Sequence, residues 1–457
     1  MSLRVVAAVL LCKLLRLVSR ILHKGGTAMP GRYALKICPE LLSIVSKGVQ
    51  TVAITGTNGK TTSARMVEEA FEKQGLSYFS NRSGANLISG ITTEFVLNSN
   101  IFGKNRKQYA VIECDEGAAK SVFPRIKPKV VLVTNLFSDQ LDRYGDVTNT
   151  LENIREALRA TPETAMLLNA DCSLTASLAA DLDNKAVFYG VDKGAAPSVE
   201  LSENSDARHC LRCGTKYDYE YINYGHLGGF SCPKCGYSRP KADYAVTDIP
   251  SRRVDGSSIV MDIRGEKRTA EVNLPAMYNV YNAVGAVAAV AEMGLGVDAG
   301  MEAVASFKCG FGRMEHFALG SAGARMMLVK NPAGCNQVID FLENIEERFI
   351  LAIALNDRTG DGKDISWVWD VDFEKFCAME GRISKIIACG DRAWDMALRL
   401  KYAGISPALV EVQQDYDEMI RWMEAQDEAI FLMPTYSAMM DMRQAIVRRI
   451  GGDDFWA

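Results

Sequence analysis

The sequence predicts an α/β protein made of two α/β domains, one of which carries a small cysteine-rich insert. Three observations lead to this fold class. Apolar strand-like runs alternate with helical patterns along most of the chain, which is typical of largely parallel sheets. A glycine-rich turn joins one such run to a helical pattern at residues 55–62. Two Cys-x2-Cys pairs stand together between residues 205 and 240, apart from the other cysteines.

Composition is typical of a globular protein and argues against nucleic-acid binding. The chain has 457 residues, enough for two or three domains, and is 48% hydrophobic and 24% charged. Its net charge of −4 gives no sign of nucleic-acid binding. Most of the 12 cysteines are scattered in apolar surroundings, as free buried thiols are. Since no export signal is visible, we expect a reducing, cytoplasmic location.

Residues 1–48 predict an N-terminal amphipathic helix and a lead-in to the first domain. Residues 3–22 are rich in Leu and Val, with basic side chains interleaved. The uninterrupted apolar run Val5–Leu11 is too short to span a bilayer. The sequence leaves two alternatives open: the helix rests on the inner face of the cytoplasmic membrane, or it packs on its own domain.

The turn at residues 55–62 predicts a phosphate-binding loop. It follows the apolar run Val52–Ile54 and precedes a helical pattern, so backbone amides and the helix dipole would face a bound phosphate. Lys60 can reach the terminal phosphates, and the Thr61 hydroxyl can bind Mg²⁺. The general Walker pattern has glycine where Ile54 stands, so the loop is a variant. The expected ligands of the phosphates are Thr55, Gly56, Thr57, Asn58, Gly59, Lys60, Thr61 and Thr62.

A second apolar run, residues 109–112, ends in the acidic residues Glu113, Asp115 and Glu116. Carboxylates at the C-terminal end of a strand beside a phosphate loop are suited to holding Mg²⁺. We expect Glu113 to be the magnesium ligand together with Thr61, with Asp115 or Glu116 as alternatives.

Two further motifs follow in order: Thr-Asn-x-x-x-Asp-x-Leu-Asp-x-x-Gly at residues 134–145 and Asn-Ala-Asp at residues 169–171. With the phosphate loop, they resemble the central domain of the Mur ligases and folylpolyglutamate synthases. The resemblance implies a Mur-ligase-like ATPase domain over residues 49–316, which activates a carboxylate with ATP as an acyl phosphate before an amine attacks. Gln140 stands where that superfamily usually has histidine.

The same resemblance assigns three more residues to the nucleotide. Asn279 and Asn282 match an Asn-x-x-Asn helix start, and Arg313 matches the arginine of Gly-Arg-x-Glu. Read without the resemblance, the asparagines could simply cap a helix, and Arg313 could clamp phosphate or form a structural ion pair.

The four grouped cysteines predict a zinc ribbon, inserted at about residues 205–240. The pairs are separated by eighteen residues, and a glycine follows each pair, which suits a tight metal-binding knuckle. Four thiolates leave no open coordination position, so the zinc would be structural. The expected ligands are Cys210, Cys213, Cys232 and Cys235. The insert has few basic residues, which argues against nucleic acid.

Residues 317–457 predict a smaller C-terminal α/β domain. Its strand-like run at residues 349–355 is followed by an acidic, glycine-rich loop with two tryptophans, which Mur ligases lack. This loop, the cysteine insert and Pro434-Thr435-Tyr436 are similar to the MurT family, the Mur-ligase-like subunits of lipid II isoglutaminyl synthase. The resemblance covers nearly the whole chain. It implies ATP-dependent amidation of the α-carboxylate of D-glutamate in the lipid II stem peptide, giving D-isoglutamine.

The resemblance also implies a partner, the glutaminase subunit GatD, which contacts the C-terminal domain and releases ammonia from glutamine. One aspartate of the acidic loop would complete the partner's Cys-His pair into a triad, in which a carboxylate orients the imidazole. Asp357 and Asp364 are the leading candidates and Asp361 follows; a solvated turn capped by Asp side chains is the alternative.

Two other functions remain as alternatives. An amino-acid-adding Mur ligase or folylpolyglutamate synthase is disfavoured by Gln140, Lys330 and the acidic loop. A nonenzymatic ATP-binding scaffold is disfavoured by the intact Lys60, Thr61 and Glu113. The chain shows no cysteine in a nucleophile-elbow setting with a plausible histidine partner, so a glutamine-dependent reaction would require a second subunit.

Overall fold

The computed structural model describes residues 3–21, 27–81, 85–137, 147–201, 206–253, 256–307, 313–358 and 360–451. They form two compact units: the first ends at Phe307, and the second is made by the residues that follow, together with residues 274–276. The predicted α/β class is confirmed. The second unit begins before residue 317, because Arg313–Phe317 forms the edge strand of the C-terminal sheet.

The first unit alternates helices and strands over most of its length. Its helices are α1 (Leu3–Ile21), α2 (Met29–Ile37), α3 (Leu41–Val45), α4 (Lys60–Lys73), α5 (Ile88–Leu97), α6 (Glu116–Ile126), α8 (Val147–Arg159), α9 (Ser173–Ala176), α10 (Met277–Val290) and α11 (Val297–Ser306), with a 3-10 turn at Ser177–Ala180 and an irregular turn at Ala291–Leu295. Its strands are β1 (Gln50–Thr55), β2 (Tyr78–Ser80), β3 (Tyr109–Glu113), β4 (Val130–Val133), β5 (Ala165–Asn169), β6 (Ala186–Val191), β7 (Asp218–Tyr224), β8 (Leu227–Ser231), β9 (Tyr244–Arg253), β10 (Gly256–Ile263) and β11 (Glu266–Val272).

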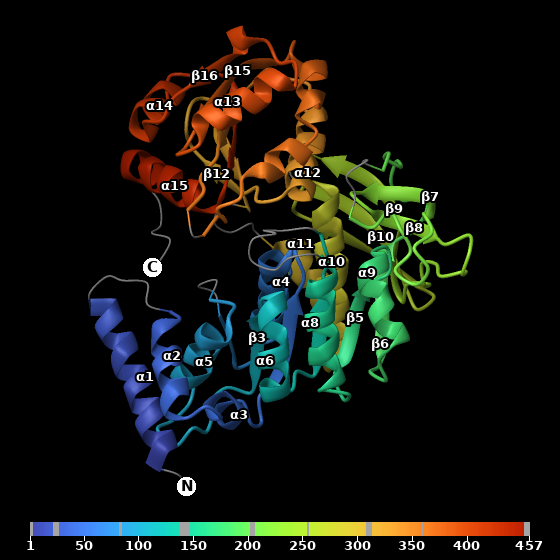
Figure 1. The fold of residues 1–457 in the computed structure, drawn as a ribbon, viewed down its shortest axis with the longest axis vertical. Helices are drawn as coiled ribbons and strands as arrows, with labels where there is room; N and C mark the ends of the chain where they lie inside the picture. Colours follow the sequence, from blue (N-terminus) through green and yellow to red (C-terminus); the bar gives the residue numbers. More distant parts are fainter. Residues whose placement is uncertain are drawn as a thin grey trace. The chain divides into compact units, whose positions relative to one another are not determined.

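Nine of these strands form one sheet in the order β11-β10-β9-β6-β5-β4-β1-β3-β2. The pairs from β2 to β9 are parallel, whereas β9, β10 and β11 form an antiparallel meander at the other edge. Figure 1 shows helices α4, α6 and α8 along the parallel part of this sheet. In such sheets ligands bind beyond the carboxyl ends of the strands, which is where the sequence motifs lie.

The strands of this sheet are the apolar runs of the sequence. In β1 every residue after Gln50 is buried, and Val130–Val133 is buried throughout, because helices cover both faces of a parallel sheet. None of the described helices combines the length and the apolar character needed to cross a bilayer. Helices α1, α2 and α3 belong to this first unit and pack on α5 and on one another.

The cysteine-rich insert forms a separate antiparallel hairpin of β7 and β8. Aromatic side chains form its small core. Tyr217, Phe230 and Tyr237 are buried and pack together with ring centroids 5.3–6.3 Å apart. The predicted insert is therefore a compact ribbon in the described residues.

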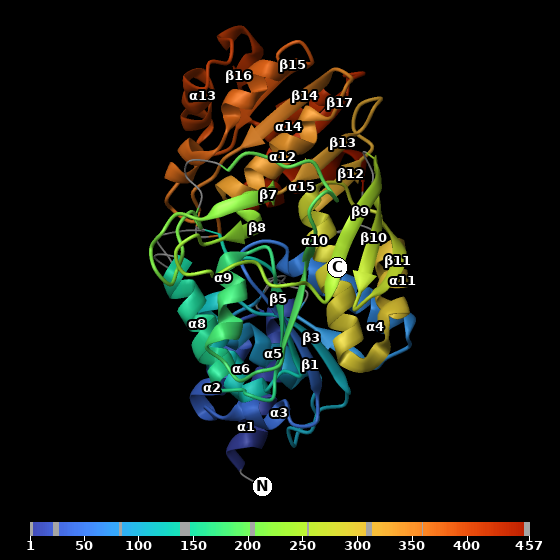
Figure 2. The ribbon, with the colours of Figure 1, turned by 90° about the vertical axis from the view of Figure 1, so that its right-hand side faces the viewer.

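The second unit is a six-stranded sheet in the order β12-β13-β17-β14-β15-β16, in which only the β12–β13 pair is antiparallel (Figure 2). Its strands are β12 (Arg313–Phe317), β13 (Ala324–Met327), β14 (Phe349–Ala354), β15 (Ile383–Cys389), β16 (Val410–Val412) and β17 (Ala429–Pro434). Its helices are α12 (Pro332–Glu343), α13 (Ala393–Tyr402), α14 (Tyr416–Met423) and α15 (Tyr436–Ile450), with 3-10 turns at Ser366–Asp370, Phe373–Met379 and Pro407–Leu409.

Strand β14 is the centre of this unit. All six of its residues are buried, and their side chains alternate between two apolar clusters on opposite faces of the sheet. The loop that follows β14 is the acidic loop of the sequence. It therefore starts from a rigid position at the carboxyl edge of the sheet.

Candidate active site

The phosphate loop joins the end of β1 to the start of α4, as the sequence predicts. Gly56 and Gly59 have φ angles of 117° and 88°, a region that L-residues avoid. A Cβ at Gly59 would lie 2.0 Å from Oδ1 of Asn282, and one at Gly56 would lie 2.3 Å from Oγ1 of Thr134. Both glycines are therefore required by conformation and by space.

Hydrogen bonds fix the loop to the segment after β4. The Asn58 N–H donates to Oδ1 of Asn135 at 3.0 Å, and the Asn135 amide donates back to the Asn58 carbonyl at 3.2 Å. The Thr57 hydroxyl donates to the Phe137 carbonyl and accepts from the Phe137 N–H. The buried hydroxyl of Thr55 finds no hydrogen-bond partner in the described residues.

Lys60 lies at the first position of α4, and its ammonium contacts Glu116 at 2.7 Å. Burial alone would lower the pKa of Lys60, but the carboxylates of Glu116 and Glu113 outweigh burial and raise it. The side chain therefore stays charged, and its ammonium group forms an ion pair with the Glu116 carboxylate. An incoming phosphate would compete with this carboxylate for Lys60.

The predicted magnesium ligands lie side by side. The Thr61 hydroxyl donates to Oε2 of Glu113 at 2.8 Å, so the two oxygens are close enough to bind one ion. Hydroxyl and carboxylate oxygens are the donors that Mg²⁺ prefers, so these residues fit the ion. Asn81, which the sequence did not single out, fixes the end of β3: its amide donates to the Glu113 carbonyl at 2.8 Å and accepts from the Glu113 N–H at 2.9 Å.

The two alternative ligands have other contacts. Asp115 caps α6, accepting hydrogen bonds from the N–H groups of Gly117 and Ala118. Glu116 pairs with Lys60. Glu113 thus remains the first choice as magnesium ligand, and Asp115 is the least suited because its carboxylate already satisfies a helix terminus.

Asn282 and Asn279 lie on α10, next to the phosphate loop. Asn282 donates to Oδ1 of Asn279 at 3.2 Å and accepts from the Ser63 hydroxyl at 3.4 Å. Both side chains are buried. Of the other predicted residues, Thr62 is buried in α4, Arg313 opens β12 with a side chain outside the description, and Gln140 lies outside the described residues altogether.

The four cysteines converge as predicted. All four sulfur atoms lie within 4.8 Å of one another, with Cys210 and Cys235 at 3.5 Å and Cys213 and Cys232 at 3.4 Å. Tetrahedral zinc with Zn–S bonds of about 2.3 Å needs sulfurs about 3.8 Å apart.

The thiols of this cluster have shifted pKa values. Hydrogen bonds from Thr215 lower the pKa of Cys213 to about 6. Although a backbone hydrogen bond from Tyr237 opposes the shift, burial and the neighbouring thiols raise the pKa of Cys235 to about 12. Four converging cysteine sulfurs are a donor set that fits tetrahedral zinc.

The ribbon is tied to the nine-stranded sheet of the first unit by a buried ion pair. Arg239 donates from Nε to Asp171 at 2.6 Å, and Asp171 also accepts from the Val191 N–H and the Tyr281 hydroxyl. Burial raises the pKa of Asp171, and Arg239 partly offsets that effect. The Asn-Ala-Asp motif therefore anchors the insert, a role that no sequence signal indicated, because Arg239 lies 68 positions away from Asp171.

The three aspartates of the acidic loop lie in different environments. Asp357 is partly exposed and lies 3.5 Å from Nε of Arg392. Asp364 is exposed, and the Ser366 side chain and N–H lower its pKa. Asp361 is 7% exposed and accepts hydrogen bonds from the N–H and hydroxyl of Ser437, in the first turn of α15. Asp361 is therefore placed as a helix cap, whereas the other two side chains can reach a neighbouring molecule.

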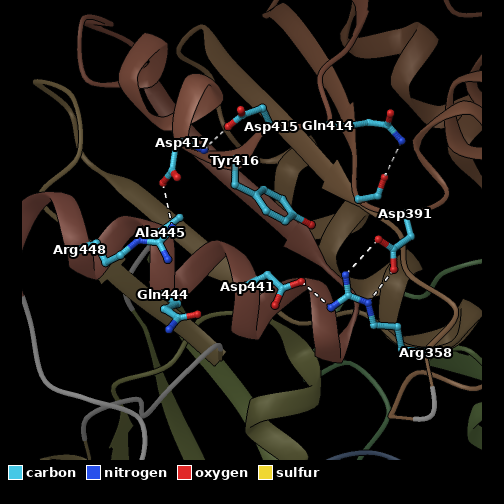
Figure 3. A pocket seen from close by; sticks show the side chains of 11 residues that line it. Arg358, Asp391, Gln414, Asp415, Tyr416, Asp417, Asp441, Gln444, Ala445 and Arg448 are labelled. Carbon is cyan, nitrogen blue, oxygen red and sulfur yellow. Dashed lines mark hydrogen bonds and ion pairs between the residues drawn. The ribbon is translucent and has the colours of Figure 1, made fainter.

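Arg358 fastens the start of this loop. It makes two hydrogen bonds to Asp391, at 2.7 and 3.0 Å, and one to Asp441 at 2.7 Å, and these hydrogen bonds raise its pKa. These side chains line a pocket of about 440 Å³ at the carboxyl edge of the second sheet (Figure 3). Asp357 and Arg358 thus form ion pairs with the successive residues Arg392 and Asp391, which clamps the loop to the end of β15.

Comparison with known protein families agrees with this arrangement. Residues 54–233 match the Mur ligase middle domain, and residues 328–439 match the MurT ligase C-terminal domain. The chain is 31% identical over 446 residues to the lipid II isoglutaminyl synthase (glutamine-hydrolyzing) subunit MurT of Staphylococcus aureus (strain COL), covering 97% of this chain and 98% of that protein. The chain belongs to the MurT family. The subunit MurT of Streptococcus pneumoniae is also 31% identical, over 93% of each chain.

Solved structures show that the Mur-ligase fold extends over both units. A pseudomurein peptide ligase type C from Methanothermus fervidus matches with a TM-score of 0.66 at 20% identity, covering 88% of this chain and 79% of that one. A folylpolyglutamate synthase from Mycobacterium tuberculosis matches with a TM-score of 0.61 at 14% identity, covering 94% and 99%. These structural matches show that the chain has the Mur-ligase fold.

Proposed function

We propose that this chain is the ATP-dependent ligase subunit of a glutamine-dependent amidating enzyme that acts on lipid II in peptidoglycan biosynthesis. Its substrate is the α-carboxylate of D-glutamate in the stem peptide, and its product is D-isoglutamine. The observation that carries the proposal is the convergence of Lys60, Thr61 and Glu113 beside the phosphate loop, in a chain similar to MurT subunits over nearly its full length.

The chemistry needs two steps. A carboxylate oxygen attacks the γ-phosphorus of ATP, the bond to the β-phosphate oxygen breaks, and ADP leaves. The acyl phosphate then has a good leaving group: the nitrogen lone pair of ammonia attacks the carbonyl carbon, phosphate departs, and nitrogen loses a proton to form the amide. Without activation, a carboxylate would offer ammonia no comparable leaving group.

The residues of the first unit divide this work. Backbone N–H groups of the loop and the start of α4 bind the phosphates, and the Lys60 ammonium neutralises the charge of the transferring phosphoryl group. Magnesium, held by Thr61 and Glu113, supplies further charge neutralisation when it is bound. The Asn282 side chain packs against Gly59 and leaves no room for a Cβ there, so it helps to set the conformation of the loop. Zinc held by the four cysteines is structural; one zinc per chain by elemental analysis is expected, and none would reject the site.

Ammonia must come from a partner, which we propose is the glutaminase GatD bound to the C-terminal domain in a heterodimer. Three exposed aromatic side chains support a docking surface there. Trp369, Trp394 and Tyr402 are 50%, 69% and 71% exposed, and the Trp369 and Tyr402 rings meet edge to face at 5.7 Å. Exposed tryptophan and tyrosine are typical of the centres of protein interfaces. Trp394 is two positions from Arg392, which holds Asp357.

Mass spectrometry of lipid II tests the proposal. The chain with Mg-ATP and ammonium should give a stem peptide lighter by about 1 Da, the change from hydroxyl to amino. Glutamine should replace ammonium only when the glutaminase is present. Lys60→Ala should abolish both reactions.

If folded, zinc-loaded protein with an active glutaminase gives no amidation under either condition, the proposal fails. The alternative, an amino-acid ligase of the Mur or folylpolyglutamate type, would then be tested by supplying amino acids as acceptors and searching for a peptide adduct.

A further inference from the structure

Helix α1 exposes an apolar stripe that its own unit leaves uncovered. Its buried residues Val5, Ala8, Val9 and Cys12 pack toward α2 and α5. The opposite side of the helix carries six apolar side chains that are 43–88% exposed: Leu3, Leu10, Leu14, Leu17, Val18 and Ile21. At 100° per residue these six fall within about one third of the helix circumference. A surface helix normally presents polar residues there.

Helix α2 packs beside α1 (Figure 1). It repeats the pattern of exposed apolar side chains on a smaller scale. Met29, Tyr33 and Ile37 are 36–46% exposed and are spaced four residues apart, so they lie along one side of the helix. Together the two helices expose nine large apolar side chains. Exposed apolar surface of this kind marks a site of interaction.

Charge distinguishes this segment from the rest of the protein. Residues 1–39 contain seven Lys and Arg and no Asp or Glu, whereas residues 40–457 contain 45 Lys and Arg and 56 Asp and Glu. Arg20, Arg32 and Lys36 are exposed on the same two helices. The segment is therefore a basic, apolar end on an otherwise acidic molecule.

We propose that α1 and α2 dock in the plane of an anionic lipid bilayer, with the apolar stripes in the headgroup–acyl boundary and the basic residues on lipid phosphates. A helix with this composition that cannot span a bilayer lies along its surface. A second copy of the chain is a poorer occupant, since its own basic face would be repelled. The biological role of this docking rests on the proposed function, because docking would hold the active site near a lipid-linked substrate. The test of membrane binding itself does not require activity.

Co-sedimentation of the full chain, in complex with the glutaminase, with two kinds of vesicle tests the inference. Vesicles of phosphatidylcholine with about one third phosphatidylglycerol should bind it, and vesicles of phosphatidylcholine alone should bind at least tenfold less. Leu14→Glu with Leu17→Glu should reduce binding at least tenfold. Arg20→Glu with Arg32→Glu should reduce vesicle binding by at least about fivefold for each arginine replaced.

Val199→Glu is the matched control, because Val199 is also an exposed apolar residue of the first unit but belongs neither to these two helices nor to α5, on which they pack. It should bind vesicles as the unchanged protein does. Amidation of detergent-solubilised lipid II with ammonium shows that each variant is folded. If the unchanged protein does not amidate, the proposed function fails, while sedimentation still decides the membrane inference.

Three results would overturn the inference. One is equal sedimentation with and without anionic lipid, and another is unaltered binding by both α1 and charge-reversal variants. The third is a dimer in light scattering that Leu14→Glu with Leu17→Glu converts to monomer without loss of vesicle binding, because the stripe would then join copies of the chain.

Discussion

The three aspartates of the acidic loop differ in whether their carboxylates are exposed or enclosed. Asp357 and Asp364 have exposed or partly exposed carboxylates, whereas Asp361 is enclosed between Arg358 and the first turn of α15. A residue that completes a partner's triad must be able to leave its own surface contacts. A residue that caps a helix must not.

Asp357→Asn and Asp364→Asn test the triad directly. At one of these positions, glutamine-driven amidation should fall by about 1,000- to 10,000-fold, because an uncharged amide cannot stabilise the partner's imidazolium. Ammonium-driven amidation should stay unchanged, since that route bypasses glutamine. The control is Asp395→Asn, whose carboxylate also lies 3.5 Å from Nε of Arg392. Full glutamine-driven activity in both variants and in Asp361→Asn would refute a triad contribution from this loop.

Asp361→Ala should act on stability. It removes the acceptor for the Ser437 N–H and hydroxyl, a loss of about 1–2 kcal/mol for a helix cap. The melting temperature of the second unit should fall by about 2–4 °C per kcal/mol. Differential scanning calorimetry measures it, with exposed Asp364→Ala as the comparison. An unchanged melting temperature would show that the contact contributes nothing.

Elements of the first unit were largely predictable from the sequence, because parallel strands buried on both faces are continuous apolar runs. The phosphate loop, the Glu113 strand end and the four converging cysteines follow from short-range patterns of this kind. The Lys60–Glu116 pair, Asn81 and the Asp171–Arg239 pair did not, because each joins residues from different elements. Strand β12 begins at Arg313, before the predicted start of the C-terminal domain at residue 317, because a strand of five residues has no clear periodic signal in the sequence.

Arg239→Ala should weaken the attachment of the zinc ribbon. Asp171 would remain fully buried without its cation, which costs about 3–5 kcal/mol. Because burial raises the pKa of Asp171 above 3.8, the folded form binds a proton more readily than the unfolded form, and stability falls as the pH rises through that range. Without Arg239 this pKa rises further, so the defect should be larger at pH 7.5 than in mild acid.

Urea unfolding at several pH values measures this prediction. Arg253→Ala is the matched control, because its ion pair with Glu271 is exposed at both ends and contributes less than about 1 kcal/mol. A defect in Arg239→Ala that does not depend on pH would mean that Asp171 is not the group left uncompensated.

The whole molecule consists of two α/β units: the first carries the phosphate loop, and the second carries the acidic loop and the exposed aromatic side chains Trp369, Trp394 and Tyr402. Trp394→Glu with Tyr402→Glu should therefore weaken glutaminase binding by at least tenfold, as expected when interface aromatics are removed. Glutamine-driven amidation should fall in parallel, while ammonium-driven amidation is retained. Isothermal titration calorimetry measures the binding, with exposed Val199→Glu in the first unit as control. Unchanged affinity would place the partner elsewhere.

The central claim is that this chain phosphorylates the α-carboxylate of its substrate at the loop containing Lys60. The most direct measurement uses lipid II with ¹⁸O in both oxygens of that carboxylate, together with Mg-ATP and ammonium. The account predicts that each amide formed releases one phosphate containing one ¹⁸O, because the carboxylate oxygen leaves with the phosphoryl group, and that Lys60→Ala releases none. Amide formation with unlabelled phosphate, or with ¹⁸O in AMP, would contradict it.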